Sequence, residues 1–138
     1  MKVIDADNMV LGRLASVVAK RLLEGEEIVI VNAEKAVIIG NKYYIINKYI
    51  ERRNIGSVRK GPYYPKMPDR ILRRTVRGML PMKKSSGRAA YKRLRVYMGI
   101  PKEFENCEME KIEEAKNNKL KGFITLAELS KHLGAKLR

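Results

Sequence analysis

The sequence is poor in the residues that build covalent or metal-held folds. Its 138 residues include one cysteine, one histidine and no tryptophan. The single cysteine, Cys107, can form neither an intramolecular disulfide nor a multi-cysteine zinc site, so we expect a reducing, cytosolic setting. Aliphatic runs are no longer than 28–31 and 36–39, and Asp5 and Asp7 interrupt the start of the chain. We therefore expect no signal peptide and no membrane-spanning segment.

Motifs of small-molecule enzymes are also missing. The turn after the first expected strand contains only Gly12, whereas a dinucleotide-binding loop has three glycines, and no phosphate-binding lysine motif occurs. The sequence leaves open a dyad of Cys107 and His132, but no motif supports it. Asp5 and Asp7 would supply at best two carboxylate ligands to a metal ion. We expect no catalysis, no metal, no cofactor and no small-molecule substrate.

Positive charge is abundant and unevenly distributed. The chain has 30 Lys and Arg against 15 Asp and Glu, a net charge of +15, with a 45% hydrophobic fraction typical of globular proteins. Acids balance bases in residues 1–51 and again in residues 103–138, so the whole excess lies in residues 52–102. We interpret residues 1–138 as a single domain with a neutral α/β body (1–51), a basic segment (52–102) and a helical C-terminal segment (103–138). The basic segment predicts a polyanionic partner.

The neutral body alternates strand and helix patterns. Residues 2–5 and 36–39 are expected strands, and residues 28–31 form a continuous apolar run typical of a strand covered on both faces, as in parallel sheets. Leucines and alanines recur at helical spacing from Leu11 to Leu22, before Gly25. Asn41 is a candidate N-cap for a second helix. This order predicts a small layered α/β domain.

The C-terminal segment has one strong local signal. Thr125 and Glu128 have the spacing of a capping box, with Ile124 and Leu129 as the hydrophobic staple, which predicts a helix from 126 to about 133 that Gly134 ends. Residues 111–121 are a weaker helix candidate because most of them are charged. We find no internal repeat.

The basic segment begins with a proline-rich arm and continues as a helix. Prolines at 62, 65 and 68 have the three-residue period of polyproline II, which predicts an extended arm. The tyrosines of this arm either stack on nucleic acid or belong to a plain surface loop.

Asp69 is a candidate N-cap for a helix over 70–78, with Leu72, Val76 and Met79 on one face. Its four arginines, 70, 73, 74 and 77, share the opposite face without a nearby acid, which favours phosphate binding over an ordinary solvated face.

A second basic face follows. Residues 83–88 form a basic turn in which Ser85 or Ser86 is a candidate helix cap, and Lys84, Arg88 and Lys92 recur every fourth residue. Residues 96–97 are an expected short strand. The residues that we expect to bind RNA are Arg59, Lys60, Tyr63, Tyr64, Lys66, Arg70, Arg73, Arg74, Arg77, Lys83, Lys84, Arg88, Lys92, Arg93 and Arg95.

Four stretches of the sequence match a known family. Residues 5–16 and 31–34, the block Arg74-Thr75-Val76-Arg77-Gly78-Met79-Leu80-Pro81, and residues 93–101 resemble the universal ribosomal protein L13 family, in its archaeal and eukaryotic branch. The match spans about residues 3–102. Lys102 stands where many bacterial members have histidine.

The resemblance implies a fold, partners and a location. It implies a three-layer α/β/α domain around a mostly parallel sheet, binding of large-subunit rRNA without catalysis, neighbouring large-subunit proteins as partners, and a location on cytoplasmic ribosomes. Residues 74–81 and 83–97 would face rRNA, while Gly12 and Arg13 would pack on the domain or touch RNA. The alternatives are a nonspecific DNA-binding or nucleoid protein and a small RNA-processing enzyme.

Overall fold

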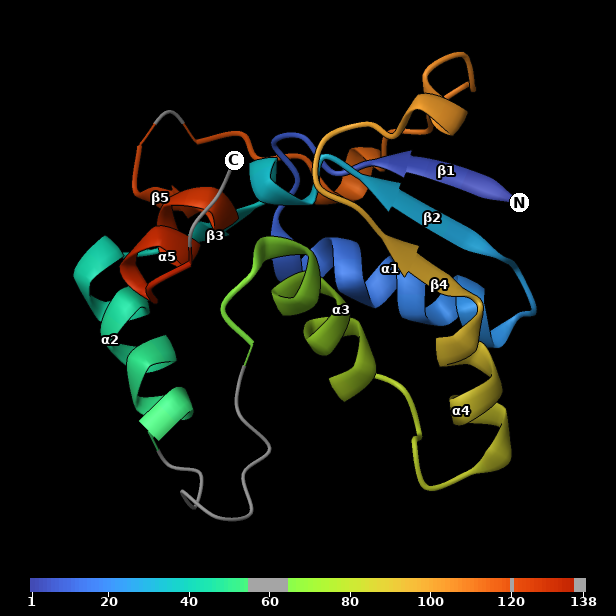
Figure 1. Cartoon of the computed structure of the whole chain (residues 1–138), viewed down its shortest axis with the longest axis horizontal. Coiled ribbons are helices and arrows are strands. Elements are labelled where there is room, and N and C mark those ends of the chain that lie inside the picture. The colour runs from blue at the N-terminus through green and yellow to red at the C-terminus, as the bar shows by residue number, and fades with distance from the viewer. Residues whose placement is uncertain (55–64, 120, 136–138) are drawn as a thin grey trace.

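The parallel sheet lies at the centre of the computed structural model, which describes residues 1–54, 65–119 and 121–135 (Figure 1). It has three strands in the order β1–β2–β4, namely β1 (Lys2–Asp5), β2 (Ile28–Val31) and β4 (Leu94–Val96). Ile30 of β2 is paired with Ile4 on one side and Val96 on the other. The strands predicted at residues 2–5 and 28–31 are confirmed, and the strand expected at 96–97 begins two residues earlier.

The central strand β2 is buried along its whole length, as its unbroken apolar run predicts. Ile28 and Ile30 belong to the main core, whereas Val29 and Val31 belong to a smaller cluster with Val3 and Phe104. Successive side chains of a strand point to opposite faces. Both faces of the sheet are therefore covered by protein.

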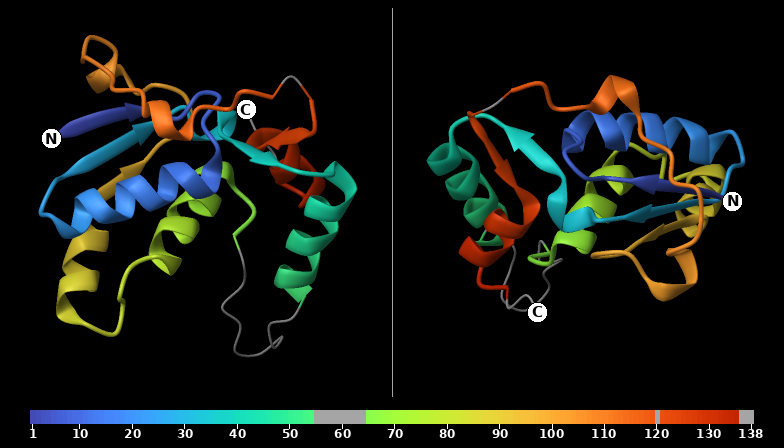
Figure 2. Two further views of the ribbon diagram at one scale, coloured as in Figure 1. Left: turned by 180° about the vertical axis from the view of Figure 1, so that it is seen from behind. Right: turned by 90° about the horizontal axis from the view of Figure 1, so that it is seen from above.

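The two faces are covered in different ways. Helices α1 (Leu11–Leu23), α3 (Pro68–Gly78) and α4 (Ser85–Lys92) lie together on one side (Figures 1 and 2). On the other side, the described chain supplies Phe104, at the end of the 3-10 turn η2 (Lys102–Phe104), with Tyr97 and Met109 packed nearby. The single α/β domain with a parallel sheet is as predicted. The second outer layer of the described part is irregular chain instead of α-helices.

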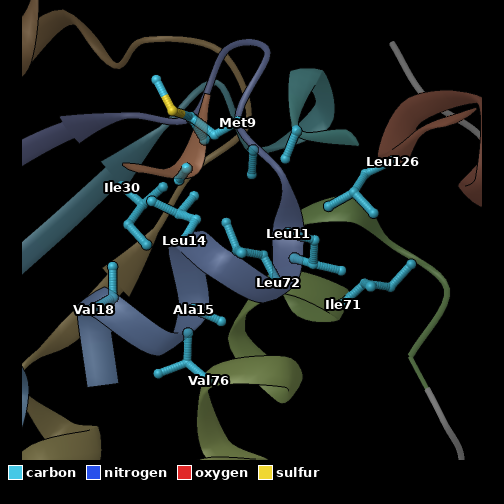
Figure 3. Packing of buried hydrophobic residues seen from close by; sticks show 14 of the residues in the cluster. Met9, Leu11, Leu14, Ala15, Val18, Ile30, Ile71, Leu72, Val76 and Leu126 are labelled. Atoms are coloured by element: carbon cyan, nitrogen blue, oxygen red, sulfur yellow. The ribbon is translucent and has the colours of Figure 1, made fainter. Parts of the chain in front are cut away.

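Helix α1 forms the middle of the main core. Leu14, Ala15, Val18 and Leu22 are fully buried along one face, at the helical spacing seen in the sequence. Figure 3 shows this face packed between Ile30 of β2 and the α3 residues Ile71, Leu72 and Val76. Gly25, with φ of +101°, follows the helix at the predicted stop.

The second, smaller sheet lies at the other end of the molecule. It pairs β3 (Val37–Ile39) with β5 (Phe123–Thr125) in antiparallel orientation, and the helices beside it are α2 (Lys42–Asn54) and α5 (Leu126–His132). The Asn41 carboxamide oxygen accepts hydrogen bonds from the Tyr43 and Tyr44 amides, which confirms its capping role. The Thr125 hydroxyl likewise accepts from the Glu128 amide, which caps α5 as predicted. Strand β5 was not predicted.

Several local expectations are wrong. In place of the helix proposed for 111–121, the described residues contain one 3-10 turn, η3 (Glu113–Ala115). Among these described residues the buried apolar side chains are Ile112 and Ala115, which are too few to form the apolar face of a longer helix. The N-cap of α3 is Met67, with Pro68 at the first helical position and Asp69 in the first turn. Met79 is exposed. The N-cap of α4 is Lys84, so Ser85 and Ser86 lie inside the helix and cap nothing.

Polar contacts close the carboxyl end of the parallel sheet. The Asn32 carboxamide donates to the Asp5 carboxylate over 2.9 Å, and the Asn32 amide donates to the Gly99 carbonyl. The Gly99 amide in turn donates to the Glu34 carboxylate at 2.8 Å. In open parallel sheets this edge is where ligands commonly bind. Here these polar groups bond to one another.

One ion pair connects α1 to the strand edge. Arg21 donates two hydrogen bonds to the Glu110 carboxylate, of 2.8 and 2.9 Å, and residue 110 forms a parallel bridge with Ile4 of β1. The bond from Arg21 lowers the pKa of Glu110 below its usual value of 4.5, against a smaller opposing effect of burial. In the folded state the Glu110 carboxyl binds its proton less tightly than in the unfolded chain. The ion pair therefore stabilises the fold above pH 4.5, and this stabilisation is lost as pH falls through the lowered pKa of Glu110.

We predict that Arg21→Gln lowers the free energy of unfolding at pH 7 by about 0.5–1 kcal/mol, since the pair is partly exposed and geometrically favourable. The difference from wild type should shrink as pH falls below 4.5. Urea denaturation at several pH values measures it, with Arg13→Gln on the exposed side of α1 as the matched control. A difference that stays constant down to acidic pH would contradict this assignment.

Candidate nucleic-acid interface

Within residues 65–102, the structure shows no ion pair between a basic side chain and an acid. The ion pairs Arg21–Glu110, Lys42–Glu128 and Lys116–Glu113 all lie outside this range. Asp69 is the only acid of the basic segment. Arginines that lack acidic neighbours repel one another unless an external anion neutralises them. This stretch is therefore suited to bind a polyanion.

Helix α3 carries the arginine face that the sequence predicts. Ile71, Leu72 and Val76 are fully buried against the core, while Arg70 and Arg73 are exposed and Arg74 and Arg77 are half-buried. In Figure 1, α3 lies between α2 on one side and α4 on the other. Since neighbouring helical residues are about 100° apart around the axis, Arg73 and Arg74 point toward different flanks of this helix.

Arg73 faces a groove beside β4. Its guanidinium carbon lies 4.5 Å from the ring centroid of Tyr91 in α4, a cation–π contact that fixes the arginine. The groove measures about 360 Å³ and also includes Lys92, Arg95 and the half-buried Tyr97. We call it the Arg73 groove. It combines three cations from α3, α4 and β4 with no acid in its lining.

Arg74 faces a larger groove on the opposite flank of α3. This groove, the Arg74 groove, has a volume of about 680 Å³. Its floor is apolar and consists of Val10, Leu11, Ile38 and Ile39. Its cations come from four parts of the chain and are Arg13, Arg52, Arg74 and Lys119. Again no acid lines the groove.

The basic turn before α4 is held in shape by close backbone contacts. The Arg88 guanidinium donates 3.2 Å hydrogen bonds to the Met82 and Lys83 carbonyls. A Cβ added at Gly87 would lie 2.0 Å from the Pro81 carbonyl oxygen, so only glycine fits. Lys83 and Lys84 remain exposed at this turn. Arg88 thus stabilises this turn through its hydrogen bonds, whether or not it also binds an anion.

Arg93 differs from the other expected RNA-binding residues. It is half-buried, and its guanidinium donates a 2.5 Å hydrogen bond to the carbonyl of Leu22, in the last turn of α1. The Leu22 carbonyl also accepts a 3.1 Å hydrogen bond from the Gly25 amide, and a cation near the last carbonyls of a helix adds a favourable interaction with the helix dipole. The structure therefore gives Arg93 a structural contact, which its spacing among basic residues could not reveal. Arg95 is exposed.

Four expected RNA-binding residues, Arg59, Lys60, Tyr63 and Tyr64, lie outside the described residues. Lys66 is described and exposed. The Arg74 groove adds Arg52 and Lys119 to the expected residues. It is also lined by Arg13, for which the family resemblance allows either packing on the domain or contact with RNA. Lys119 belongs to the charge-neutral C-terminal segment, so no local signal marked it.

The alternative catalytic groups are not brought together. Cys107 is exposed and shares a surface hollow with Lys2 and Val3 of β1, while His132 lies in α5, which is at the other end of the molecule from β1 (Figure 1). Asp5 bonds to Asn32 and to the Asp7 amide. Among the described residues no cluster of His, Cys, Asp and Glu could hold a metal ion. Over the same residues, no helix has both the length and the apolar character needed to cross a bilayer.

The chain is similar to one protein family and to individual archaeal proteins. The profile of the family described as "Ribosomal protein L13" matches residues 1–103. "Large ribosomal subunit protein uL13" of Archaeoglobus fulgidus is 58% identical over 135 residues, covering 96% of this chain and 86% of that protein. The proteins of the same name from Thermoplasma acidophilum and Methanocaldococcus jannaschii are 57% and 58% identical, covering 97% and 99% of this chain and 98% and 99% of theirs.

We predict that Arg93→Gln lowers the free energy of unfolding by roughly 1.5–2 kcal/mol, because the Leu22 carbonyl loses a charged donor in a partly buried place. Arg95→Gln is the matched control and should change stability by less than about 0.5 kcal/mol, since Arg95 is exposed. Thermal and urea unfolding of both variants measure the difference. Equal stability of the two variants would refute the structural role of Arg93.

Proposed function

This chain belongs to the ribosomal protein L13 family, and from that membership we propose that it is a structural constituent of the large ribosomal subunit that binds rRNA through its basic segment and supports subunit assembly. Family membership makes it a ribosomal protein and not an enzyme. Its location is the ribosome, in the cytoplasm. Its partners are large-subunit rRNA and the ribosomal proteins that neighbour it there.

The observation that carries the RNA-binding proposal is the pair of basic grooves on the two flanks of α3. Together they gather seven cations without a lining acid, from α1, α2, α3, α4, β4 and the loop at Lys119. A surface with cations spread over several elements fits the phosphates of a folded RNA better than a single linear site would. The arm residues Arg59, Lys60, Tyr63, Tyr64 and Lys66 stay part of the proposed RNA-binding set on the strength of the sequence.

The neutral and the basic segments of the chain have different roles in the proposed function. The neutral body, residues 1–51, supplies strands β1 and β2 and helix α1, and the basic segment adds helices α3 and α4 and the third strand, β4. Each lysine or arginine that replaces a counterion on RNA releases that ion, so the gain depends on salt. Phosphate contacts fix position without reading sequence. We infer that shape and backbone contacts dominate over base reading, and that the chain holds separate RNA segments together.

We predict that the tagged full-length chain, expressed in the organism that encodes it, co-sediments with the large subunit in sucrose gradients and remains there through a high-salt wash. Salt weakens each phosphate contact, but an integral subunit protein is held by many RNA and protein contacts that must break together, so it stays bound under salt that releases a loosely bound factor. A known loosely bound translation factor serves as the released control. Loss of the chain into the free pool at modest salt would argue against the proposed role.

A second prediction concerns the Arg73 groove. Binding to purified large-subunit rRNA should weaken with salt at a log–log slope of roughly −4 to −5 if about six phosphates are neutralised. Replacing Arg73, Lys92 and Arg95 by Ala should reduce the magnitude of that slope by about 2–3, since each lost phosphate contact removes about 0.7–0.9. Filter binding over a salt series measures this.

The matched control for that variant replaces three exposed lysines outside the basic segment, Lys2, Lys111 and Lys131, by Ala. It removes the same net charge and should leave the slope nearly unchanged. Equal slopes for the groove variant and wild type would exclude the Arg73 groove from the interface. Stronger binding to duplex DNA than to rRNA at the same salt would favour the nonspecific DNA-binding alternative.

A further inference from the structure

The Arg74 groove has features that phosphate binding alone does not explain. Its floor exposes part of Val10, Ile38 and Ile39, although all three are aliphatic side chains beside the core. Apolar surface left in contact with water is unfavourable unless a ligand covers it. The groove is also nearly twice as large as the Arg73 groove, at about 680 Å³ against 360 Å³.

We propose that the Arg74 groove is a pocket for an unpaired nucleotide of rRNA, which places its base over the aliphatic floor and its phosphate among the cations of the rim. This inference rests on the proposed rRNA-binding function and names the ligand of one part of that surface. A base in a double helix has both faces stacked, so only an extruded or single-stranded nucleotide presents an apolar face to a protein.

The rim of the groove matches the charged part of such a ligand. Arg13 reaches it from α1, Arg74 from α3 and Lys119 from the loop before β5, and no acid is present to compete with a phosphate. Arg13 and Lys119 are exposed, and Arg74 is half-buried. Bound phosphates are held by such donors in proteins, with arginine providing two parallel bonds.

One wall of the groove offers a flat cationic group. The Arg52 guanidinium carbon lies 5.0 Å from the ring centroid of Tyr49, which holds this planar group against the buried tyrosine of α2. Guanidinium planes and aromatic rings are the surfaces on which proteins stack unpaired bases. The wall formed by Arg52 and Tyr49 is thus suited to the face or edge of a base that lies on the aliphatic floor.

Two glycines keep the groove open. Gly12 lies in α1 and Gly78 ends α3, both line the groove, and neither has a positive φ that would require glycine. No atom lies within 4 Å of the place where a Cβ would stand at either position. Glycine weakens a helix relative to alanine, and neither backbone strain nor core packing explains it here. The room that both residues leave is room for a ligand.

The test fills the groove without touching the core. Gly12→Leu places a side chain where the structure has open space, so this variant should fold at least as well as wild type, which circular dichroism and urea unfolding verify. Ser16→Leu is the matched control because Ser16 is exposed one turn further along α1 and does not line the groove.

Full-length wild type and both variants are bound to purified large-subunit rRNA and probed with base-modifying reagents and hydroxyl radicals. Wild type and Ser16→Leu should protect the same unpaired bases. Gly12→Leu should lose protection of one or two adjacent unpaired bases, keep most of the backbone footprint, and bind about 10-fold more weakly, as expected for the loss of one base contact.

The outcomes separate the pocket from the proposed function. A Gly12→Leu footprint identical to wild type, or a wild-type footprint that protects only backbone of paired RNA, overturns the nucleotide pocket and leaves rRNA binding in place. Loss of the same base protection in Ser16→Leu also overturns the pocket. Absence of any wild-type footprint contradicts the proposed function, and the pocket with it.

Discussion

The burial of α3 against α1 is the contact on which the candidate interface depends. Ile71, Leu72 and Val76 are inaccessible to solvent within the main core, so the rotation of α3 about its axis is fixed. The 100° between successive residues then sends Arg73 toward α4 and β4 and Arg74 toward α1 and α2. One apolar face thus positions cations in two separate grooves.

The charge imbalance of the basic segment constrains which of its residues can serve the fold. Within residues 65–102, three arginines contact carbonyls or rings of the protein: Arg93 contacts Leu22, Arg88 contacts Met82 and Arg73 contacts Tyr91. Carboxylate partners occur instead in the neutral segments, for example between Arg21 and Glu110. Residues 1–51 and 103–138 thus contain as many acids as bases, whereas residues 52–102 carry the excess positive charge that suits this surface to an external anion.

Sequence reasoning succeeded where the signal is local. The spacing of Leu14, Val18 and Leu22 and the capping residue Thr125 predicted α1 and α5 because helices are set by neighbours within four residues. It failed where partners are distant along the chain. Strand β5 forms because β3 pairs with it, and in place of the expected helix at 111–121 the described residues form the 3-10 turn η3 and a bridge between Lys116 and Met9. The expected RNA-binding set likewise lacks Arg52 and Lys119, because these residues join the Arg74 groove only through contacts between distant parts of the chain.

The sequence by itself determined that the chain folds, that its excess charge lies in residues 52–102, and that one helix there carries arginines on a single face. Its matches to a family also determined what kind of protein it is. Only the tertiary structure decided that Arg93 holds α1, that Arg73 and Arg74 line different grooves, and that Arg13 and Lys119 join one of them. The reason is physical: charge and periodicity are properties of consecutive residues, but a groove is made by side chains from segments that meet only when the core packs.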